Sequence, residues 1–183
     1  KTEVYMNLIE RVIKSGKRAL FLVPEISLTA QMIERFYKRF SSSVAIFHSG
    51  LSNGEKYDEY QKIYRGEVSI VVGTRSAIFT PLKDIGIIIL DEEHSSTYKQ
   101  DTTPKYNAID VAKWRGKYNN CPVILGSATP LITDMTMARM GWYQLIRLTK
   151  RVGNAKLPFI RLVNMQDEVR SGHSIISRLL EEK

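Results

Sequence analysis

Ile87-Ile88-Ile89-Leu90-Asp91-Glu92-Glu93-His94 is the stretch that decides the fold of this 183-residue chain. Four apolar residues follow a glycine and end abruptly in three acids and a histidine. A short apolar run of this kind is typical of a parallel strand that is buried on both faces. In open α/β sheets, ligands bind at the carboxyl ends of the strands. The stretch therefore predicts a buried strand that carries charged side chains to the binding edge of a sheet.

The adjacent carboxylates of Asp91 and Glu92 indicate a cation at that edge. Two carboxylates beside a core repel each other and lose hydration, so a positive ligand has to share their site. Magnesium suits them, because it binds one or two carboxylates together with phosphate oxygens and waters. We expect Asp91 to hold the metal and Glu92 to point at an attacking water. For these residues alone, an ordinary strand followed by a solvated acidic turn remains the alternative.

Strands and helices alternate along the rest of the chain. Apolar residues at helical spacing predict helices at residues 4–13, 27–40, 53–64, 108–117 and 135–140. Short apolar runs predict further strands at residues 18–23, 44–47, 68–72, 122–125, 145–148 and 159–163, before a last helix that starts at 173–176. This alternation is typical of the α/β class, with a mostly parallel sheet and helices on both faces.

Small or polar residues follow most of the predicted strands. These clusters are Pro24-Glu25, His48-Ser49-Gly50, Gly73-Thr74-Arg75, Asp91-Glu92 and Ser127-Ala128-Thr129. Packing does not explain five such clusters at one edge of a sheet, so we expect them to form one extended site.

Composition limits the class of protein. Lys and Arg number 27 against 19 acids, giving a net charge of +8. Such an excess favours a polyanionic partner, because neutralised phosphates release counterions. The single Cys121 excludes an internal disulfide and a cysteine-based zinc site within this chain. The sequence shows neither a long apolar run nor a signal peptide, so we expect a soluble, cytoplasmic protein with no membrane association.

Lys1-Thr2 matches the last two residues of the phosphate-binding loop G-x-x-x-x-G-K-[ST], because a helix and a buried strand follow. The glycines of that motif do not precede it here, so we expect the chain to begin within the loop. A solvated N-terminus is the alternative for this dipeptide alone. We assign residues 1–150 to one nucleotide-binding domain. Residues 151–183 are expected to form a linker and the opening of another unit.

Six motifs stand in a fixed order along the chain. They are Lys1-Thr2, Leu22-Val23-Pro24-Glu25-Ile26-Ser27-Leu28-Thr29, His48-Ser49-Gly50-Leu51-Ser52, Gly73-Thr74-Arg75-Ser76-Ala77-Ile78-Phe79, Asp91-Glu92-Glu93-His94 and Gly126-Ser127-Ala128-Thr129-Pro130. Together they resemble the first motor domain of the superfamily 2 helicases, and more closely the replication-restart DNA helicases. Asp-Glu-Glu-His in place of Asp-Glu-Ala-Asp argues against an RNA helicase of the DEAD-box kind. The resemblance implies a RecA-like P-loop NTPase fold, with residues 151–183 opening the second motor lobe.

The resemblance also implies roles for residues of the nucleotide site. Lys1 is expected to neutralise the β- and γ-phosphates of ATP, while Thr2 and Asp91 hold magnesium. Glu92 is expected to orient and deprotonate the lytic water, with Glu93 as the next candidate. The residues expected to sense the γ-phosphate and couple its loss to DNA are His94, Ser127 and Thr129.

A further set of residues is expected to contact DNA. The backbone contacts, which position DNA without reading its sequence, are assigned to Pro24, Glu25, Gly50, Thr74, Arg75 and Ser76. For Arg75, a structural ion pair is the competing role. Residues 95–107 resemble the aromatic-rich loop of these helicases, and there Tyr98, Lys105 and Tyr106 are expected to stack on and bind a single strand. The alternative is that both tyrosines only attach the loop to the domain.

By resemblance, the complete protein is an ATP-dependent DNA helicase of replication restart that acts on single-stranded and forked DNA. Its expected partners are primosome and single-strand-binding proteins. Zinc, the second motor domain and its arginine finger are expected only in the parent protein, outside this chain. Without the arginine finger, the isolated segment is expected to be inactive. The alternatives are a non-catalytic nucleic-acid-binding module that retains an ATPase fold, and the motor lobe of another DNA-dependent ATPase such as a restriction translocase.

Overall fold

The computed structural model describes residues 1–149, 160–170 and 176–181. The chain divides into two units, Lys1–Leu145 and Ile146–Lys183. Within the described residues, the second unit contains the short helices α6 (Met165–Arg170) and α7 (Arg178–Glu181). The assignment of residues 151–183 to a linker and the opening of a second motor lobe stays a prediction.

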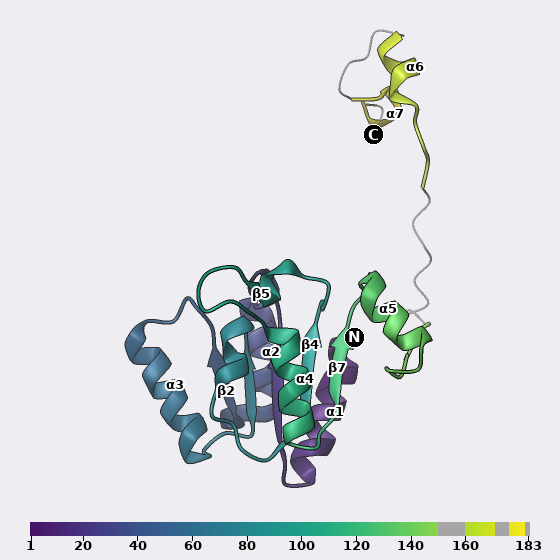
Figure 1. Ribbon diagram of the computed structural model, residues 1–183. Helices are drawn as coiled ribbons and strands as arrows, with labels where there is room; N and C mark the ends of the chain where they lie inside the picture. The colour runs from purple at the N-terminus through teal and green to yellow at the C-terminus, as the bar shows by residue number, and fades with distance from the viewer. Residues whose placement is uncertain (150–159, 171–175, 182–183) are drawn as a thin grey trace. The chain divides into compact units, whose positions relative to one another are not determined.

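The first unit is built on a five-stranded parallel sheet (Figure 1). Its strands lie in the order β2-β3-β1-β4-β7. Their bounds are β1 (Arg18–Leu22), β2 (Val44–Phe47), β3 (Ile70–Gly73), β4 (Ile85–Asp91) and β7 (Val123–Gly126). All seven residues of β4 are buried, as an apolar strand covered on both faces requires. The predicted α/β class and parallel sheet are therefore confirmed.

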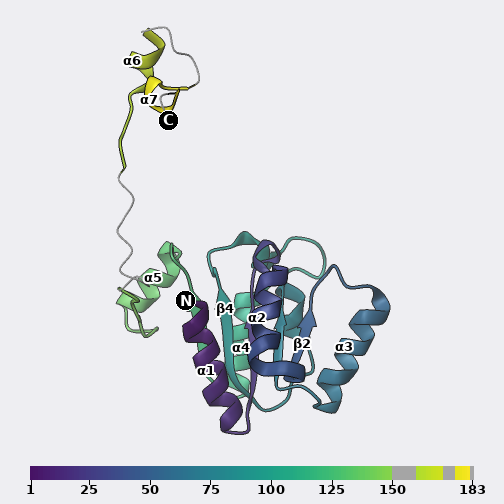
Figure 2. The same ribbon diagram turned by 180° about the vertical axis from the view of Figure 1, so that it is seen from behind.

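Helices cover both faces of this sheet. Tyr5, Met6 and Ile9 of α1 (Thr2–Lys14) and Phe36 of α2 (Ala30–Phe40) pack in one core cluster. Ile63 of α3 (Asn53–Arg65) and residues of α4 (Ala108–Tyr118) pack in the other. Figure 2 shows α1 and α2 in front of the sheet, whereas α4 is in front in Figure 1. A further helix, α5 (Ile132–Arg139), follows β7.

Local hydrogen bonds fix where three of these helices begin. The Ser52 side chain accepts from the Glu55 amide, and the Glu55 side chain accepts from the Ser52 amide, which forms a capping box at the start of α3. Thr29 caps α2, and Asn107 caps α4. None of the helices in the described part of the chain is long and apolar enough to cross a lipid bilayer.

Three predicted elements differ from the structure. Residues 145–148 form no strand, because three of their apolar side chains are exposed and no neighbouring strand pairs with them. Residues 160–163 are likewise not a strand, and Phe159 lies outside the described residues. Of the helix start predicted at 173–176, residues 173–175 lie outside the described part, and α7 begins only at Arg178.

The segment 95–107 is more ordered than an irregular loop. It contains the 3₁₀ turn η4 (Ser96–Tyr98) and a small antiparallel hairpin. The hairpin strands are β5 (Lys99–Gln100) and β6 (Tyr106–Asn107), and β6 leads directly into α4.

Gly73, the last residue of β3, tests how tightly the strand ends are packed. A Cβ atom at Gly73 would lie 2.1 Å from the Phe47 carbonyl oxygen and 2.5 Å from the Ala77 Cβ. Gly73→Ala is therefore expected to lower the free energy of unfolding by roughly 1–3 kcal/mol or more. Thermal and urea unfolding of the chain measure this. Gly54→Ala is the control, because a Cβ there meets nothing within 4 Å and sits in helix α3, so stability should stay equal or rise. Equal effects of the two substitutions would contradict the packing argument.

Candidate nucleotide and DNA site

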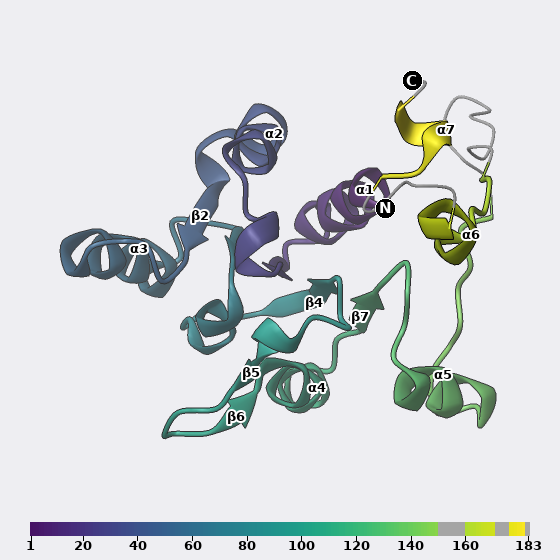
Figure 3. The same cartoon turned by 90° about the horizontal axis from the view of Figure 1, so that it is seen from above.

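The register of the parallel strands brings the predicted motifs to one edge of the sheet. Leu22 pairs with Gly73 on one side and with Leu90 on the other, and Asp91 pairs with Gly126. The residues that follow these positions therefore leave the sheet side by side. Figure 3 looks down on this edge, with α1 on one side of β4 and β7 and with α4 and the hairpin on the other.

Lys1 joins the two predicted catalytic carboxylates. Its Nζ atom lies 2.5 Å from Glu92 Oε1 and 3.1 Å from Asp91 Oδ1. Asp91 is the last residue of β4 and is buried, whereas about a third of the Glu92 side chain is exposed. Burial lowers the pKa of Lys1, but the hydrogen bonds to Glu92 and Asp91 outweigh it, so the pKa is raised overall. Lys1 therefore supplies a stable positive charge between the two acids.

Glu92 adopts an unusual backbone conformation. Its φ angle is +49°, in the left-handed region that non-glycine residues rarely occupy. The Glu92 amide donates to Asp91 Oδ1 at 3.0 Å, and the Ser95 amide donates to the Glu92 carbonyl at 2.9 Å. The chain thus turns sharply off the strand at Glu92. Such strain is held by surrounding contacts and occurs preferentially at functional sites.

The donor set at this edge fits magnesium that arrives with a nucleotide. No group of three or more His, Cys, Asp or Glu side chains able to hold a metal exists among the described residues. Magnesium does not need such a group, because one carboxylate, phosphate oxygens and waters suffice. Asp91 offers the carboxylate, and Thr2 follows Lys1 at the start of α1. The metal-binding roles of Asp91 and Thr2 stay predictions.

The residues predicted to couple ATP hydrolysis to DNA lie in one chain of contacts. His94 Nδ1 is 2.7 Å from Ser127 Oγ and 3.7 Å from Glu92 Oε2. Ser127 Oγ accepts a hydrogen bond of 3.0 Å from the Thr129 amide. The imidazole therefore bridges the predicted base and the segment that follows β7, although the coupling role itself stays a prediction.

Glu93 faces a different part of the structure. Its side chain is buried, and Oε1 accepts a hydrogen bond of 3.1 Å from the Leu131 amide at the start of α5. Burial is the main reason that the pKa of Glu93 is raised. Because its carboxyl group is buried against α5, Glu93 is a poor substitute for Glu92 as a base acting on a solvent-derived water.

Two buried tyrosine hydroxyls contact Asp91. Tyr5 Oη donates to Asp91 Oδ1 at 3.1 Å, and Tyr98 Oη donates to the Asp91 carbonyl at 2.7 Å and the Leu22 carbonyl at 3.1 Å. Tyr5 was not among the residues predicted from the sequence. The available signal was its spacing, because a residue four positions after Lys1 lies on the same face of a helix.

Three residues predicted to touch DNA are buried and therefore wrongly assigned, namely Tyr98, Thr74 and Pro24. Tyr98 is only 1% exposed and is held beneath the sheet edge by its hydroxyl, so its ring cannot stack on a base. Thr74 is 2% exposed, and its amide donates to the Phe47 carbonyl. Neither its hydroxyl nor its amide can therefore reach a DNA backbone. For Tyr98, the alternative that it attaches the loop to the domain is correct.

The other predicted DNA residues remain accessible to different degrees. Ser76 and Gly50 lie at the strand-end edge, and Glu25 Oε1 accepts a hydrogen bond of 2.8 Å from Ser49 Oγ. Arg75 donates through one guanidinium nitrogen to the carbonyls of Thr97 and Lys99. It therefore supports the hairpin through backbone carbonyls rather than through an ion pair with an acid.

Tyr106 is the aromatic residue of the hairpin that solvent can reach. It is half-buried, and its ring packs edge-on against exposed Phe79, with centroids 4.8 Å apart. The Arg75 guanidinium lies 5.9 Å from the Tyr106 ring centre, and Lys105 next to it is exposed. This group of rings and cations has the composition of a single-strand stacking site.

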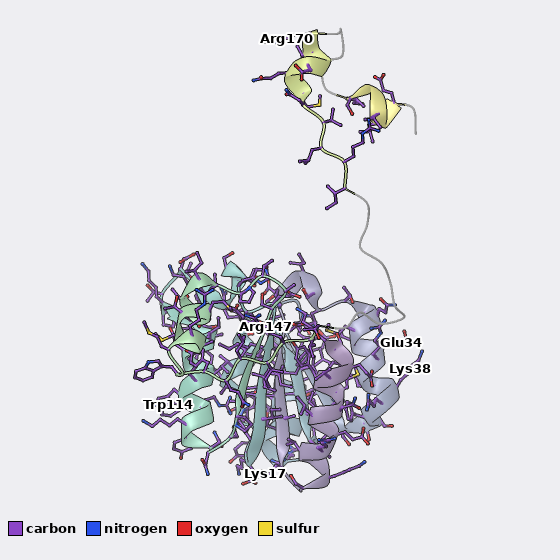
Figure 4. The ribbon with its side chains drawn as sticks, turned by 90° about the vertical axis from the view of Figure 1, so that its right-hand side faces the viewer. Lys17, Glu34, Lys38, Trp114, Arg147 and Arg170 are labelled. Carbon is purple, nitrogen blue, oxygen red and sulfur yellow. The ribbon has the colours of Figure 1, made fainter. Side chains whose placement is uncertain are left out.

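An open hollow of about 880 Å³ lies beside α4, and none of the predicted site residues lines it. Its rim includes Trp114 and Tyr118, whose rings stack with centroids 5.4 Å apart. Figure 4 shows Trp114 pointing away from the sheet. Because the strand-end edge holds the charged motifs, we place the candidate site there rather than in this more apolar hollow.

Comparison with known proteins shows the family of the chain. A protein-family model described as "Type III restriction enzyme, res subunit" matches residues 1–132. The chain belongs to that family. Replication restart protein PriA of Bacillus subtilis (strain 168) is 53% identical over 184 residues, covering 100% of this chain and 23% of that protein. The PriA protein of Synechocystis is 45% identical over 194 residues, covering 99% of this chain and 22% of that protein.

These relatives confirm the resemblance to replication-restart DNA helicases. The chain spans about a quarter of the length of the curated relatives it matches. Among solved structures, the Pyrococcus furiosus Hef helicase domain is 14% identical with a TM-score of 0.42, covering 74% of this chain and 27% of that one. The fold of this family member is the expected RecA-like α/β architecture, a parallel sheet with helices on both faces.

Tyr98 offers a direct test of the corrected assignment. Tyr98→Phe keeps the ring but removes the hydroxyl that serves two buried carbonyls, so we expect a loss of about 1–3 kcal/mol in the free energy of unfolding. Chemical denaturation of the chain measures it. Tyr106→Phe is the matched control, because Tyr106 makes its contacts through the ring rather than the hydroxyl. This substitution should change the free energy of unfolding by no more than about 0.5 kcal/mol. A smaller loss for Tyr98→Phe than for Tyr106→Phe would show that the hydroxyl does not anchor the loop.

Proposed function

We propose that this chain is the ATP-binding lobe of a DNA helicase that hydrolyses ATP to unwind DNA during replication restart in the bacterial cytoplasm. The observation that carries the proposal is the cluster of Lys1, Asp91 and Glu92 at one strand end, with His94 linking it to Ser127. The similarity to PriA proteins supports the assignment to replication restart.

In the proposed reaction, Lys1 binds the β- and γ-phosphates of ATP. The Asp91 and Glu92 carboxylates compete with these phosphates for the Lys1 amine. Asp91 and Thr2 would hold magnesium, which would supply positive charge against the phosphates. Glu92 accepts a proton from the attacking water, because its carboxylate is partly exposed and the left-handed turn carries it off the strand.

Loss of the γ-phosphate changes what His94 and the 127–129 segment contact, and this change is passed to the DNA side of the edge. The proposed DNA contacts are Glu25, Gly50, Arg75, Ser76, Lys105 and Tyr106. Single-stranded and forked DNA are the proposed substrates, with primosome and single-strand-binding proteins as partners of the complete protein. Contacts of this kind bind the DNA backbone and base faces without selecting a sequence.

Glu92 is tested as the base by Glu92→Gln in the full-length protein that carries this chain. ATP and DNA binding should persist, because Lys1, Thr2 and Asp91, the proposed phosphate and magnesium ligands, are unchanged. Turnover should fall by roughly 10²–10⁴, as removal of a general base predicts. Steady-state phosphate release and nucleotide binding are the two measurements.

The control for this experiment is Glu34→Gln. Glu34 pairs with Lys38 on α2, and both side chains are well exposed (Figure 4). Its turnover should equal that of the unchanged protein. Normal hydrolysis by the Glu92→Gln protein would assign the base elsewhere, and an unchanged full-length protein that binds DNA without hydrolysing ATP would favour the non-catalytic alternative.

Tyr106→Ala tests the hairpin as a DNA contact. We expect a roughly 5- to 100-fold weaker affinity for single-stranded DNA, corresponding to the 1–3 kcal/mol of one stacked base, and less stimulation of ATP hydrolysis by DNA. The DNA-free hydrolysis rate should change little, whereas the melting temperature should fall modestly, because the Tyr106 ring also packs against Phe79 and the core. Tyr118→Ala is the matched control, because Tyr118 is exposed at the far end of α4 and stacks only on Trp114 in the described structure. Equal DNA affinities of the two variants would remove Tyr106 from the site.

A further inference from the structure

The Asp91 carboxylate is held mainly through one of its two oxygens. Oδ1 accepts from Tyr5 Oη at 3.1 Å and from the Glu92 amide at 3.0 Å, and it lies 3.1 Å from Lys1 Nζ. In the part of the chain that the structure describes, all three contacts end on Oδ1. Oδ2 is therefore the oxygen that stays available to a further ligand.

Tyr5 is itself rigidly placed. It is 5% exposed, and its ring lies 5.7 Å from the Phe21 ring in the core between α1 and the sheet. Its hydroxyl also approaches the end of β7 so closely that a Cβ atom at Gly126 would lie 1.8 Å from it. The hydroxyl thus lies against Asp91 at the end of β4 and Gly126 at the end of β7. At position 126, only glycine leaves room for it.

The hydroxyl acts as a donor to Asp91. Its oxygen lies 3.1 Å from Oδ1, and an ionised carboxylate only accepts hydrogen bonds, so the phenol is the donor. Lys1 is a less permanent neighbour, because the phosphates of a bound nucleotide attract the same amine. When Lys1 turns to phosphate, Tyr5 is the side chain that continues to hold Oδ1.

We propose that Tyr5 is a positioning residue for the divalent cation of the nucleotide site, holding Asp91 by Oδ1 so that Oδ2 binds the cation or its waters. The inference rests on the proposed function, since it concerns the cation that accompanies ATP. Groups that orient a metal-binding side chain commonly change metal affinity or activity by roughly 10- to 100-fold when they are removed. Tyr5→Phe removes only the hydroxyl and keeps the ring against Phe21.

The test uses the full-length protein that carries this chain and a fluorescent ADP derivative as the probe. Binding of the probe is measured while free Mg²⁺ is varied, and again in EDTA. In Tyr5→Phe, the Mg²⁺ concentration at half-maximal binding should rise about 10-fold or more. Probe affinity in EDTA should stay the same, because Lys1 and the phosphate contacts are intact. A merely structural tyrosine would lower the melting temperature without moving the Mg²⁺ dependence.

Tyr98→Phe is the comparison variant. Tyr98 is as deeply buried as Tyr5, but its hydroxyl serves main-chain carbonyls rather than the carboxylate. An equal rise in the Mg²⁺ requirement of both variants would show general loosening of the end of β4 and overturn the role of Tyr5. An unchanged Mg²⁺ requirement in Tyr5→Phe would overturn it as well. If the unchanged protein binds no nucleotide at any Mg²⁺ concentration, the proposed function itself fails, and that result is distinct from the other two.

Discussion

The contact of Lys1 with Asp91 and Glu92 is the interaction on which the rest of this edge depends. β4 is covered on both faces, so its carboxyl end would bring two neighbouring acids close to a dry core. A cation has to lie beside them, and α1 delivers it from its first turn. For this, α1 must lie against the sheet beside β4, and buried Tyr5 and Ile9 of that helix keep it there. Because the ion pair is partly exposed, solvent screening limits its effect on stability, and its main consequence is the placement of charge.

The hairpin after His94 is attached to the same strand end from two directions. From inside, the Tyr98 hydroxyl binds the carbonyls of Asp91 and Leu22. From outside, Arg75 binds the carbonyls of Thr97 and Lys99. A shift of the hairpin therefore strains hydrogen bonds on the main chain of Asp91 itself. The proposed DNA contact at Tyr106 is therefore linked to the nucleotide edge through the main chain of this segment.

The strand and helix pattern was readable from the sequence because burial leaves a periodic signal. Ile87 to Leu90 are apolar because both faces of β4 are covered, and the helix predicted at residues 53–64 agrees with α3. The same reasoning failed at residues 145–148, since an apolar run predicts a strand only if a neighbouring strand is there to pair with it. Residue type is also a poor guide to direction at a strand end. A tyrosine and a threonine have the chemistry of DNA contacts, yet Tyr98 and Thr74 point inward.

The three consecutive acids illustrate why the site needed a structure. In the sequence, Asp91, Glu92 and Glu93 are nearly equivalent carboxylates. In the fold, Asp91 ends the strand and is held by Tyr5, Glu92 leaves the strand in a left-handed turn, and Glu93 is buried against the start of α5. One change of backbone direction at Glu92 thus separates three environments within three residues. The partly exposed acid can meet water, the acid held at Oδ1 can offer its other oxygen to a cation, and the buried acid ties β4 to the helix that follows β7. The turn at Glu92 thus places three similar acids in different environments, and residue types alone do not reveal that turn.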